Sequence, residues 1–245
     1  MPNAWCHAFI MAFKAVFFDA DGTLIRPAKP IGESYALLAG KYGKQVPATE
    51  VRERFRSCFS SAPPLAFPGA TSKDLPDLER GWWRELVRSV FEPWGSFEQF
   101  DDYFADLFRY FSSPEAWSLF PETVETLSIL RQRGFTLAVI SNFDSRLFGI
   151  LEGLGLDSWF ESIHISSRVG YAKPAPEIYR AALALHHLKA KEALHIGDSA
   201  EKDAAGASNA GLTGVLLDRN GRCPTDSFPR VRDLKEVLTL VDQQS

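Results

Sequence analysis

The sequence predicts an α/β protein whose core is a Rossmann-like, doubly wound parallel sheet of about five strands, with an α-helical insertion after the first strand. Three observations predict this class. Short apolar runs alternate with helical patterns in the C-terminal half. An early stretch, from about residue 27 to residue 115, has helical spacing and no buried-strand run. A single strand pattern precedes that stretch and ends in a glycine turn.

The first strand is predicted at residues 14–18, an apolar run rich in β-branched and aromatic residues. Asp19 and Asp21 follow it directly, and Gly22 allows the chain to turn sharply. Residues two apart on an extended chain project to the same side, so the two carboxylates are expected side by side at the strand end. Such a pair suits metal binding together with nucleophilic or acid/base chemistry.

The insertion is predicted to be a helical cap domain at residues 27–115, leaving residues 12–26 and 116–245 as the α/β core domain. Four of its segments have helical spacing, and the Pro- and Gly-rich stretch 62–76 between them is predicted to be a loop. The helical segments are residues 32–41, 50–59, 82–91 and 98–111. Residues 1–11 are expected to be an N-terminal extension, either disordered or upstream of a start at Met11.

The remaining strands are predicted at residues 135–140, 160–165, 193–196 and 213–217. Helical patterns separate them, with Pro121 and Pro176 at predicted first helical positions and Gly134 and Gly155 at helix ends. Strands that alternate with helices of this length imply a parallel sheet covered on both faces.

Composition limits the functional classes. The net charge of −4 argues against a sequence-independent nucleic-acid binder, which needs a basic surface. No apolar run reaches the length of a membrane span, so no membrane association is expected. The three cysteines contain no C-x-x-C pair, which fits a reducing, cytoplasmic compartment without a zinc site. The protein is expected to be a monomer or a homodimer.

Polar residues follow four of the predicted strands in order. After the first strand come Asp19 and Asp21, and then, along the chain, Ser141 with Asn142, Lys173, and Asp198. In a parallel sheet the ligands bind beyond the carboxyl ends of the strands, so these groups are expected at one edge. Each group alone has an ordinary explanation as a turn or a solvated loop, but their shared position favours a common site.

Each residue type has a chemical use at such a site. Asp19 and Asp198 offer oxygen ligands for a hard cation such as Mg²⁺. Ser141 offers a hydroxyl ahead of a helix N-terminus, where backbone N–H groups bind anions. Lys173 is a point charge that neutralises a phosphate and an attacking carboxylate. Asp203, five residues after Asp198, is expected in the first turn of the next helix, where it would orient the metal ligands without binding the metal itself.

These residues resemble the four motifs of the haloacid dehalogenase-like hydrolase superfamily, and the resemblance extends from residue 13 to about residue 240. The helical insertion resembles that superfamily's C1 type of cap. Residues 170–174 and the overall layout are most similar to the branch of haloacid dehalogenase-like hydrolase domain-containing protein 3. The motifs are Asp19-Ala20-Asp21-Gly22-Thr23, Ser141-Asn142, Lys173, and Gly197-Asp198-Ser199 with Asp203.

The resemblance implies a phosphatase acting on a small phosphorylated molecule. Asp19 would attack phosphorus to form an aspartyl-phosphate, and Asp21 would protonate the leaving alcohol and then activate water. The groups holding the phosphoryl group would be Ser141, Asn142 and Lys173. The ligands of Mg²⁺ would be Asp19, the backbone carbonyl of Asp21, and Asp198. The substrate stays open between classes such as sugar phosphates and nucleotides.

Three alternatives remain on the same fold. Dehalogenases of the superfamily carry Tyr where this chain has Asp21 and dispense with the metal, so Asp21 and Asp198 argue against dehalogenation. Related phosphomutases usually have Glu-Asp where this chain has Gly197-Asp198. A non-catalytic scaffold that binds a partner through its cap would have no use for Asp21.

Overall fold

The structure is a computed structural model that describes residues 13–221, 223 and 227–242. The N-terminal extension predicted at residues 1–11 therefore lies outside the described residues. Within the described ranges, none of the helices combines the length and the apolar character needed to cross a lipid bilayer.

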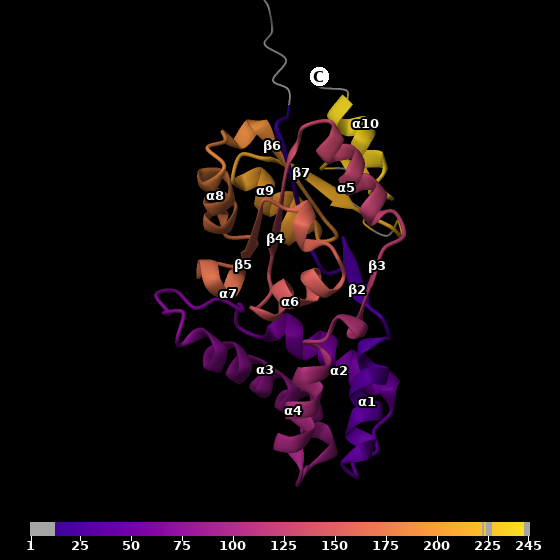
Figure 1. The fold of residues 1–245 in the computed structure, drawn as a ribbon. Coiled ribbons are helices and arrows are strands. Elements are labelled where there is room, and N and C mark those ends of the chain that lie inside the picture. Colours follow the sequence, from indigo (N-terminus) through magenta and orange to yellow (C-terminus); the bar gives the residue numbers. More distant parts are fainter. Residues whose placement is uncertain (1–12, 222, 224–226, 243–245) are drawn as a thin grey trace, which may run out of the picture.

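A six-stranded parallel sheet with helices on both faces forms the larger part of the structure, and this confirms the predicted α/β class (Figure 1). The strand order is β5-β4-β1-β6-β7-β8, so the chain winds outward in both directions from β1. The sixth strand, β8, spans two residues and is too short to give a sequence pattern. The bounds are β1 Ala15–Phe18, β4 Thr136–Ser141, β5 Ser162–Ile165, β6 Ala193–Gly197, β7 Thr213–Leu217 and β8 Arg230–Val231.

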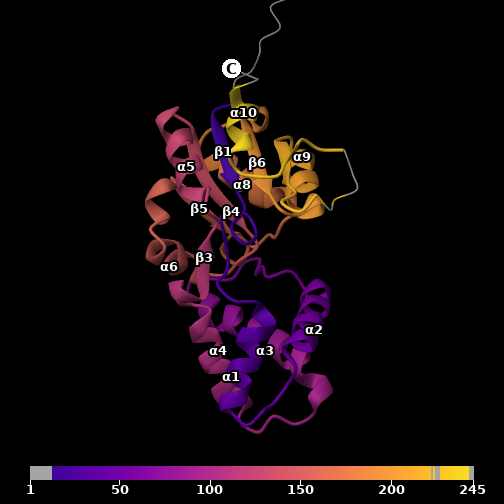
Figure 2. The ribbon, with the colours of Figure 1, turned by 90° about the vertical axis from the view of Figure 1, so that its right-hand side faces the viewer.

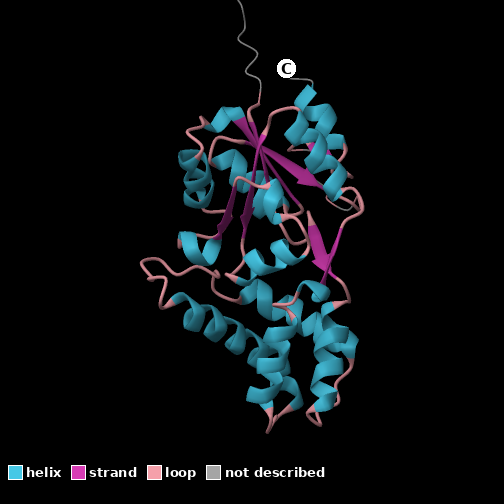
Figure 3. Cartoon of the chain, in the orientation of Figure 1, coloured by secondary structure: helices cyan, strands magenta, loops and turns pink. Residues whose placement is uncertain are grey.

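Helices cover both faces of the sheet because β1 is apolar on both sides. Val16 and Phe18 pack with helices α5, α6 and α10, whereas Ala15 and Phe17 pack with α8 and α9 on the opposite face. Figure 3 shows these helices flanking the strands. Their bounds are α5 Thr123–Gln132, α6 Arg146–Gly153, α8 Pro176–Leu185, α9 Gly206–Asn209 and α10 Glu236–Asp242, and a short helix, α7 Ser166–Val169, follows β5.

Four helices form a separate layer beyond the carboxyl ends of the strands (Figures 1 and 2). They share an apolar core of their own, built largely from aromatic side chains such as Tyr35, Tyr103 and Phe104. A two-stranded antiparallel ribbon, β2 Ile25–Pro27 and β3 Trp117–Leu119, carries the chain into this layer and back. The helices are α1 Ile31–Lys41, α2 Ala48–Ser61, α3 Leu75–Phe91 and α4 Phe100–Tyr110.

The structure differs from the predicted elements at several boundaries. Helix α3 begins at Leu75, seven residues before the predicted start, because Pro76 occupies its first turn, where a missing N–H is tolerated. Helix α5 begins at Thr123, so Pro121 lies just outside it. The β2–β3 ribbon was not predicted, since three-residue strands show no readable alternation. The domain boundaries 27–115 stay a prediction.

Candidate active site

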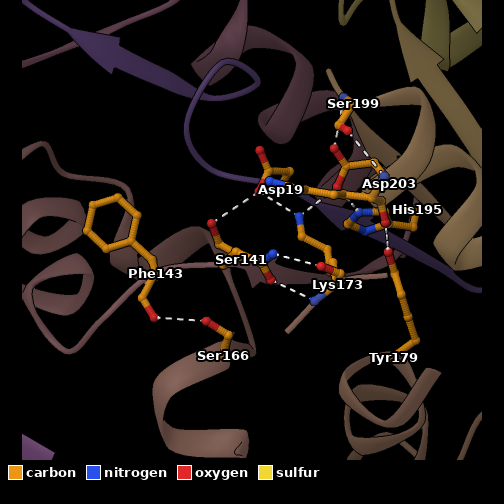
Figure 4. Close-up of polar contacts among 11 residues, drawn as sticks. Asp19, Ser141, Phe143, Ser166, Lys173, Tyr179, His195, Ser199 and Asp203 are labelled. Atoms are coloured by element: carbon orange, nitrogen blue, oxygen red, sulfur yellow. Dashed lines mark hydrogen bonds and ion pairs between the residues drawn. The ribbon is translucent and has the colours of Figure 1, made fainter. Parts of the chain in front are cut away.

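The predicted site residues meet at the carboxyl edge of the sheet, where the chain leaves β1, β4 and β6. Asp19 follows β1, Ser141 is the last residue of β4, and Asp198 follows β6. Parallel pairing of β1 with both β4 and β6 places these ends next to one another. Lys173 reaches the same point from the loop after α7 (Figure 4).

Lys173 lies between two carboxylates in the buried interior. Its ammonium donates hydrogen bonds to Asp19 Oδ1 at 2.7 Å and to Asp203 Oδ1 at 2.6 Å (Figure 4). Burial alone lowers the pKa of Lys173, but the two carboxylates outweigh burial and the pKa is raised. The ammonium is therefore charged, and it fixes the orientation of the Asp19 carboxylate together with Ser141, whose hydroxyl donates to Asp19 Oδ1 at 3.1 Å.

Asp203 supports Lys173 from within the core. Although burial opposes it, Lys173 and His195 hold the pKa of Asp203 well below its usual range. His195 Nε2 lies 3.0 Å from Asp203 Oδ1, and the backbone N–H of Ser199 donates to Oδ2 at 3.0 Å. A Cβ atom at Gly197 would come within 2.2 Å of the Asp203 carboxyl carbon, so the glycine makes this position possible.

Three carboxylates approach closely enough to share a cation. Oxygens of Asp19, Asp198 and Asp203 all lie within 4.8 Å of one another. Two oxygens bound to one Mg²⁺ lie at most about 4.2 Å apart, so small side-chain rotations would bring a pair of these into range. Both oxygens of Asp203 accept hydrogen bonds, whereas the contacts of Asp19 with Lys173 and Ser141 fall on Oδ1 alone. Asp19, through Oδ2, and Asp198 are therefore the carboxylates placed to bind a metal. Gly22 lets Asp198 approach, because a Cβ there would lie 2.3 Å from Asp198 Oδ2.

Burial and neighbouring carboxylates raise the pKa values of two acidic groups at the site. Burial, and then the charges of Asp19 and Asp203, raise the pKa of Asp198 to about 7. Burial, followed by the charges of Asp19 and Asp198, raises the pKa of Asp21 to about 7. Asp21 is accessible from the cavity between the two layers, yet it is surrounded by protein. A carboxyl with such a pKa can both donate and accept a proton near neutral pH.

The side chain of Asn142 is engaged by the Lys173 loop. Its Nδ2 donates to the carbonyl oxygen of Lys173 at 2.9 Å, and its Oδ1 accepts from the Lys173 backbone N–H at 2.7 Å. These two bonds position the lysine that contacts Asp19. A direct contact between Asn142 and phosphate stays a prediction.

Residues that join the helical layer to the site were not predicted from the sequence. Glu79 of α3 accepts hydrogen bonds from the backbone N–H and hydroxyl of Ser145, at the start of α6. Trp83 of α3 donates through its indole to Asp144, which also binds Arg146 through two hydrogen-bonded oxygens. The long sequence separations hide these pairs. Trp83 also lines the cavity beside Asp21.

The contact that His195 makes with Asp203 could not be predicted from the sequence. His195, in β6, is fully buried against the Tyr179 ring. Its contact with Asp203 gives it a further role, because it helps to fix the carboxylate that holds Lys173. Figure 4 shows the successive contacts from His195 to Asp203, from Asp203 to Lys173, and from Lys173 to Asp19.

Comparison with known proteins agrees with this geometry. The sequence pattern of the haloacid dehalogenase-like hydrolase family matches residues 13–211. Haloacid dehalogenase-like hydrolase domain-containing protein 3 of Bos taurus is 34% identical over 91% of this chain and 87% of its own length. A HAD phosphatase from Thermococcus onnurineus is 25% identical, with a TM-score of 0.67 over 94% of this chain and 98% of that structure.

The fold alone is shared more widely. L-2-haloacid dehalogenase from Xanthobacter autotrophicus has a TM-score of 0.71 over 95% of this chain and 100% of that structure, at 16% identity. The family pattern and the Bos taurus relative each cover most of the chain, and the four predicted motifs meet at one edge of the sheet. The chain belongs to the haloacid dehalogenase-like hydrolase family, in the branch of the domain-containing protein 3 relatives.

Proposed function

We propose that this hydrolase is a Mg²⁺-dependent phosphatase that acts on a small phosphomonoester through an aspartyl-phosphate on Asp19. The observation that carries the proposal is the set of carboxyl groups at this edge of the sheet: an Asp19 paired with Lys173, and next to it a protonatable Asp21 and Asp198. Phosphoryl transfer needs a nucleophile, an acid for the leaving oxygen and positive charge for the phosphoryl oxygens.

The residues divide these tasks. Asp19 attacks phosphorus. Ser141 and Lys173 orient Asp19 by donating hydrogen bonds to its Oδ1, and the same two side chains contact the phosphoryl oxygens. Asp21 gives its proton to the departing alcohol oxygen, and the carboxylate that results accepts a proton from the water that hydrolyses the intermediate. A Mg²⁺ ion held by Asp19, Asp198 and the backbone carbonyl of Asp21 would supply charge neutralisation for the phosphate.

The acidic cluster supports a phosphatase over the alternatives. Halide is a stable anion and needs no proton donor, so a dehalogenase would leave Asp21 and its raised pKa without a task. A binding scaffold would likewise have no use for three carboxylates gathered within 4.8 Å of one another, where a single lysine pairs with only two of them. In a phosphomutase the residue before Asp198 is usually Glu, whereas a side chain at Gly197 would collide with Asp203.

Phosphate release from phenyl phosphate tests the proposal directly. We expect turnover with Mg²⁺, none after chelation with EDTA, and no halide release from 2-chloropropionate with or without metal. Metal-independent halide release would establish a dehalogenase instead. A folded, Mg²⁺-binding protein that turns over no phosphate ester would favour a binding scaffold, and transfer of phosphate to an added sugar would favour a mutase.

The stabilisation by Mg²⁺ is expected to depend on pH. Because the pKa of Asp198 is raised to about 7, this group is protonated below pH 7 and must lose a proton to bind the cation. The affinity should fall about tenfold per pH unit below 7 for one released proton. The Mg²⁺-induced rise in melting temperature should therefore be larger at pH 8 than at pH 6.

Histidines that titrate between the two pH values change the melting temperature itself. The Mg²⁺-induced rise in melting temperature is compared instead, because a contribution that is the same with and without metal cancels. The pKa of His164 is lowered to about 4 by burial and then by His186, and it contributes equally with and without metal. In Asp198→Asn protein the Mg²⁺-induced rise in melting temperature should be much smaller at both pH values, because one of the two carboxylate ligands is lost. An equal Mg²⁺ effect at both pH values in the unmodified protein would contradict the assignment of Asp198 as a ligand.

A further inference from the structure

A cavity of about 130 Å³ lies between the helical layer and the sheet, and the candidate acid Asp21 forms part of its wall. Asn142, Phe143 and Arg146 also line it from the core side, and helices α1 to α4 supply most of the rest. The alcohol oxygen that Asp21 protonates belongs to the leaving group, so the cavity is the space into which the leaving group extends. Its volume resembles that of a protein cavity of about 150 Å³ known to bind benzene.

The walls of this cavity are mostly aromatic and aliphatic. Tyr35, Val87 and Phe104 are at most 2% exposed, and Phe108 and Trp117 extend the same surface. A hydroxyl group transferred from water to such a wall without a hydrogen-bond partner loses stability. A sugar carries several hydroxyls, so the wall disfavours it and favours an apolar group.

The charges at the wall are already compensated. Arg146 lies over the rings of Trp83 and Phe108, 4.9 Å and 4.1 Å from their centroids. Its guanidinium is paired with Asp144, which is fully buried. Arg146 is the one cationic side chain among the residues that line the cavity, all of which are described. A second phosphate or a carboxylate on the leaving group would therefore meet no free positive charge.

We infer that the substrate is the phosphate ester of a compact, uncharged, apolar alcohol with the bulk of about one aromatic ring. This inference rests on the proposed function for the phosphate end and on the cavity for the other end. A nucleoside exceeds the volume of the cavity. Asn142, Arg146 and the Trp83 indole are engaged by other groups, so Asp21 and the Tyr35 hydroxyl are the polar side-chain groups that remain among the lining residues, too few for the several hydroxyls of a sugar. The apolar alcohol fills the space and places its oxygen beside Asp21.

A matched panel of primary-alcohol esters tests the inference. Benzyl phosphate, glucose 6-phosphate and adenosine 5′-monophosphate have leaving groups of similar reactivity and differ in shape and polarity. We expect kcat/KM for benzyl phosphate to exceed that for the other two by about 100-fold, and that for ethyl phosphate by about tenfold. A preference for the sugar phosphate or the nucleotide would overturn the inference and leave the phosphatase proposal standing.

A cavity-filling variant separates the cavity from general effects on folding. Ile31 lines the cavity from α1, whereas Leu37 on the same helix is 62% exposed and lies outside the wall. Ile31→Trp should lower kcat/KM for benzyl phosphate tenfold or more and change that for ethyl phosphate less than threefold. Leu37→Trp should change neither. An equal loss for both esters in Ile31→Trp protein would contradict the placement of the leaving group.

Binding of phosphonates keeps the test independent of turnover. Benzylphosphonate should bind the Mg²⁺-loaded protein at least tenfold more tightly than ethylphosphonate, and Ile31→Trp should abolish the difference. If no ester is hydrolysed, the proposed function fails, yet this comparison still decides whether the cavity selects an apolar group. Equal affinities for the two phosphonates would overturn the inference.

Discussion

Replacing Asp19 by Asn is expected to lower kcat on phenyl phosphate by about 10⁴-fold or more, because the attacking oxygen is lost while the shape is kept. The Asp19 carboxylate accepts hydrogen bonds from Ser141 and Lys173 at one oxygen, and no other carboxylate occupies that position. Rates of phosphate release under saturating substrate measure the effect.

The fold should survive this change. Asn has the same shape, and Lys173 retains its bond to Asp203. The melting temperature should stay within about 4 °C, which corresponds to roughly 1 kcal/mol in a chain of this size. Asp101→Asn, at an exposed position on α4 where Asp101 pairs with Arg84 of α3, is the matched control and should leave the rate unchanged. Turnover by Asp19→Asn protein within tenfold of the unmodified rate would show that another group attacks.

Replacing Lys173 by Met is expected to destabilise the protein and to stop catalysis. The Lys173 side chain is 2% exposed and its ammonium contacts two carboxylates, so its removal leaves buried negative charge without a cationic partner. A loss of about 3–5 kcal/mol in the free energy of unfolding is expected, measured by urea denaturation without metal. Activity should fall about 10³-fold, since Lys173 no longer faces the phosphoryl oxygens.

An exposed lysine provides the control for this experiment. Lys14 pairs with Glu192 at the surface, where its side chain is 63% exposed, so Lys14→Met should cost far less stability than Lys173→Met. Added Mg²⁺ should recover part of the stability of Lys173→Met protein, because the cation offsets the same carboxylates. Equal destabilisation by the two variants would contradict the central position of Lys173.

The sheet and its site edge could be predicted from the sequence because local signals determine them. The apolar run at β1, the acidic pair after it and the glycine at Gly22 lie within nine residues of one another. Parallel pairing then leaves few choices for where Ser141 and Asp198 can lie. Strand order and the sixth strand, β8, depend on packing that no short window records.

The contacts between the helical layer and the core could not be predicted in the same way. Glu79 and Ser145 are 66 residues apart, and Trp83 and Asp144 are 61 apart. An aromatic residue has the same helical spacing whether it fills a core or lines a cavity, so periodicity alone cannot separate the two. The role of His195 was hidden for a related reason, since its partner Asp203 lies on the next element of the chain.

The most direct measurement is mass spectrometry of rapidly quenched Asp21→Asn protein after a single turnover with Mg²⁺ and phenyl phosphate. Without the carboxylate that activates water, hydrolysis of the intermediate should slow more than its formation from this reactive ester. The peptide that contains Asp19 should then gain one phosphoryl group in nearly every molecule. A phosphoryl group on a different residue, or rapid phosphate release from protein that never becomes modified, would contradict attack by Asp19.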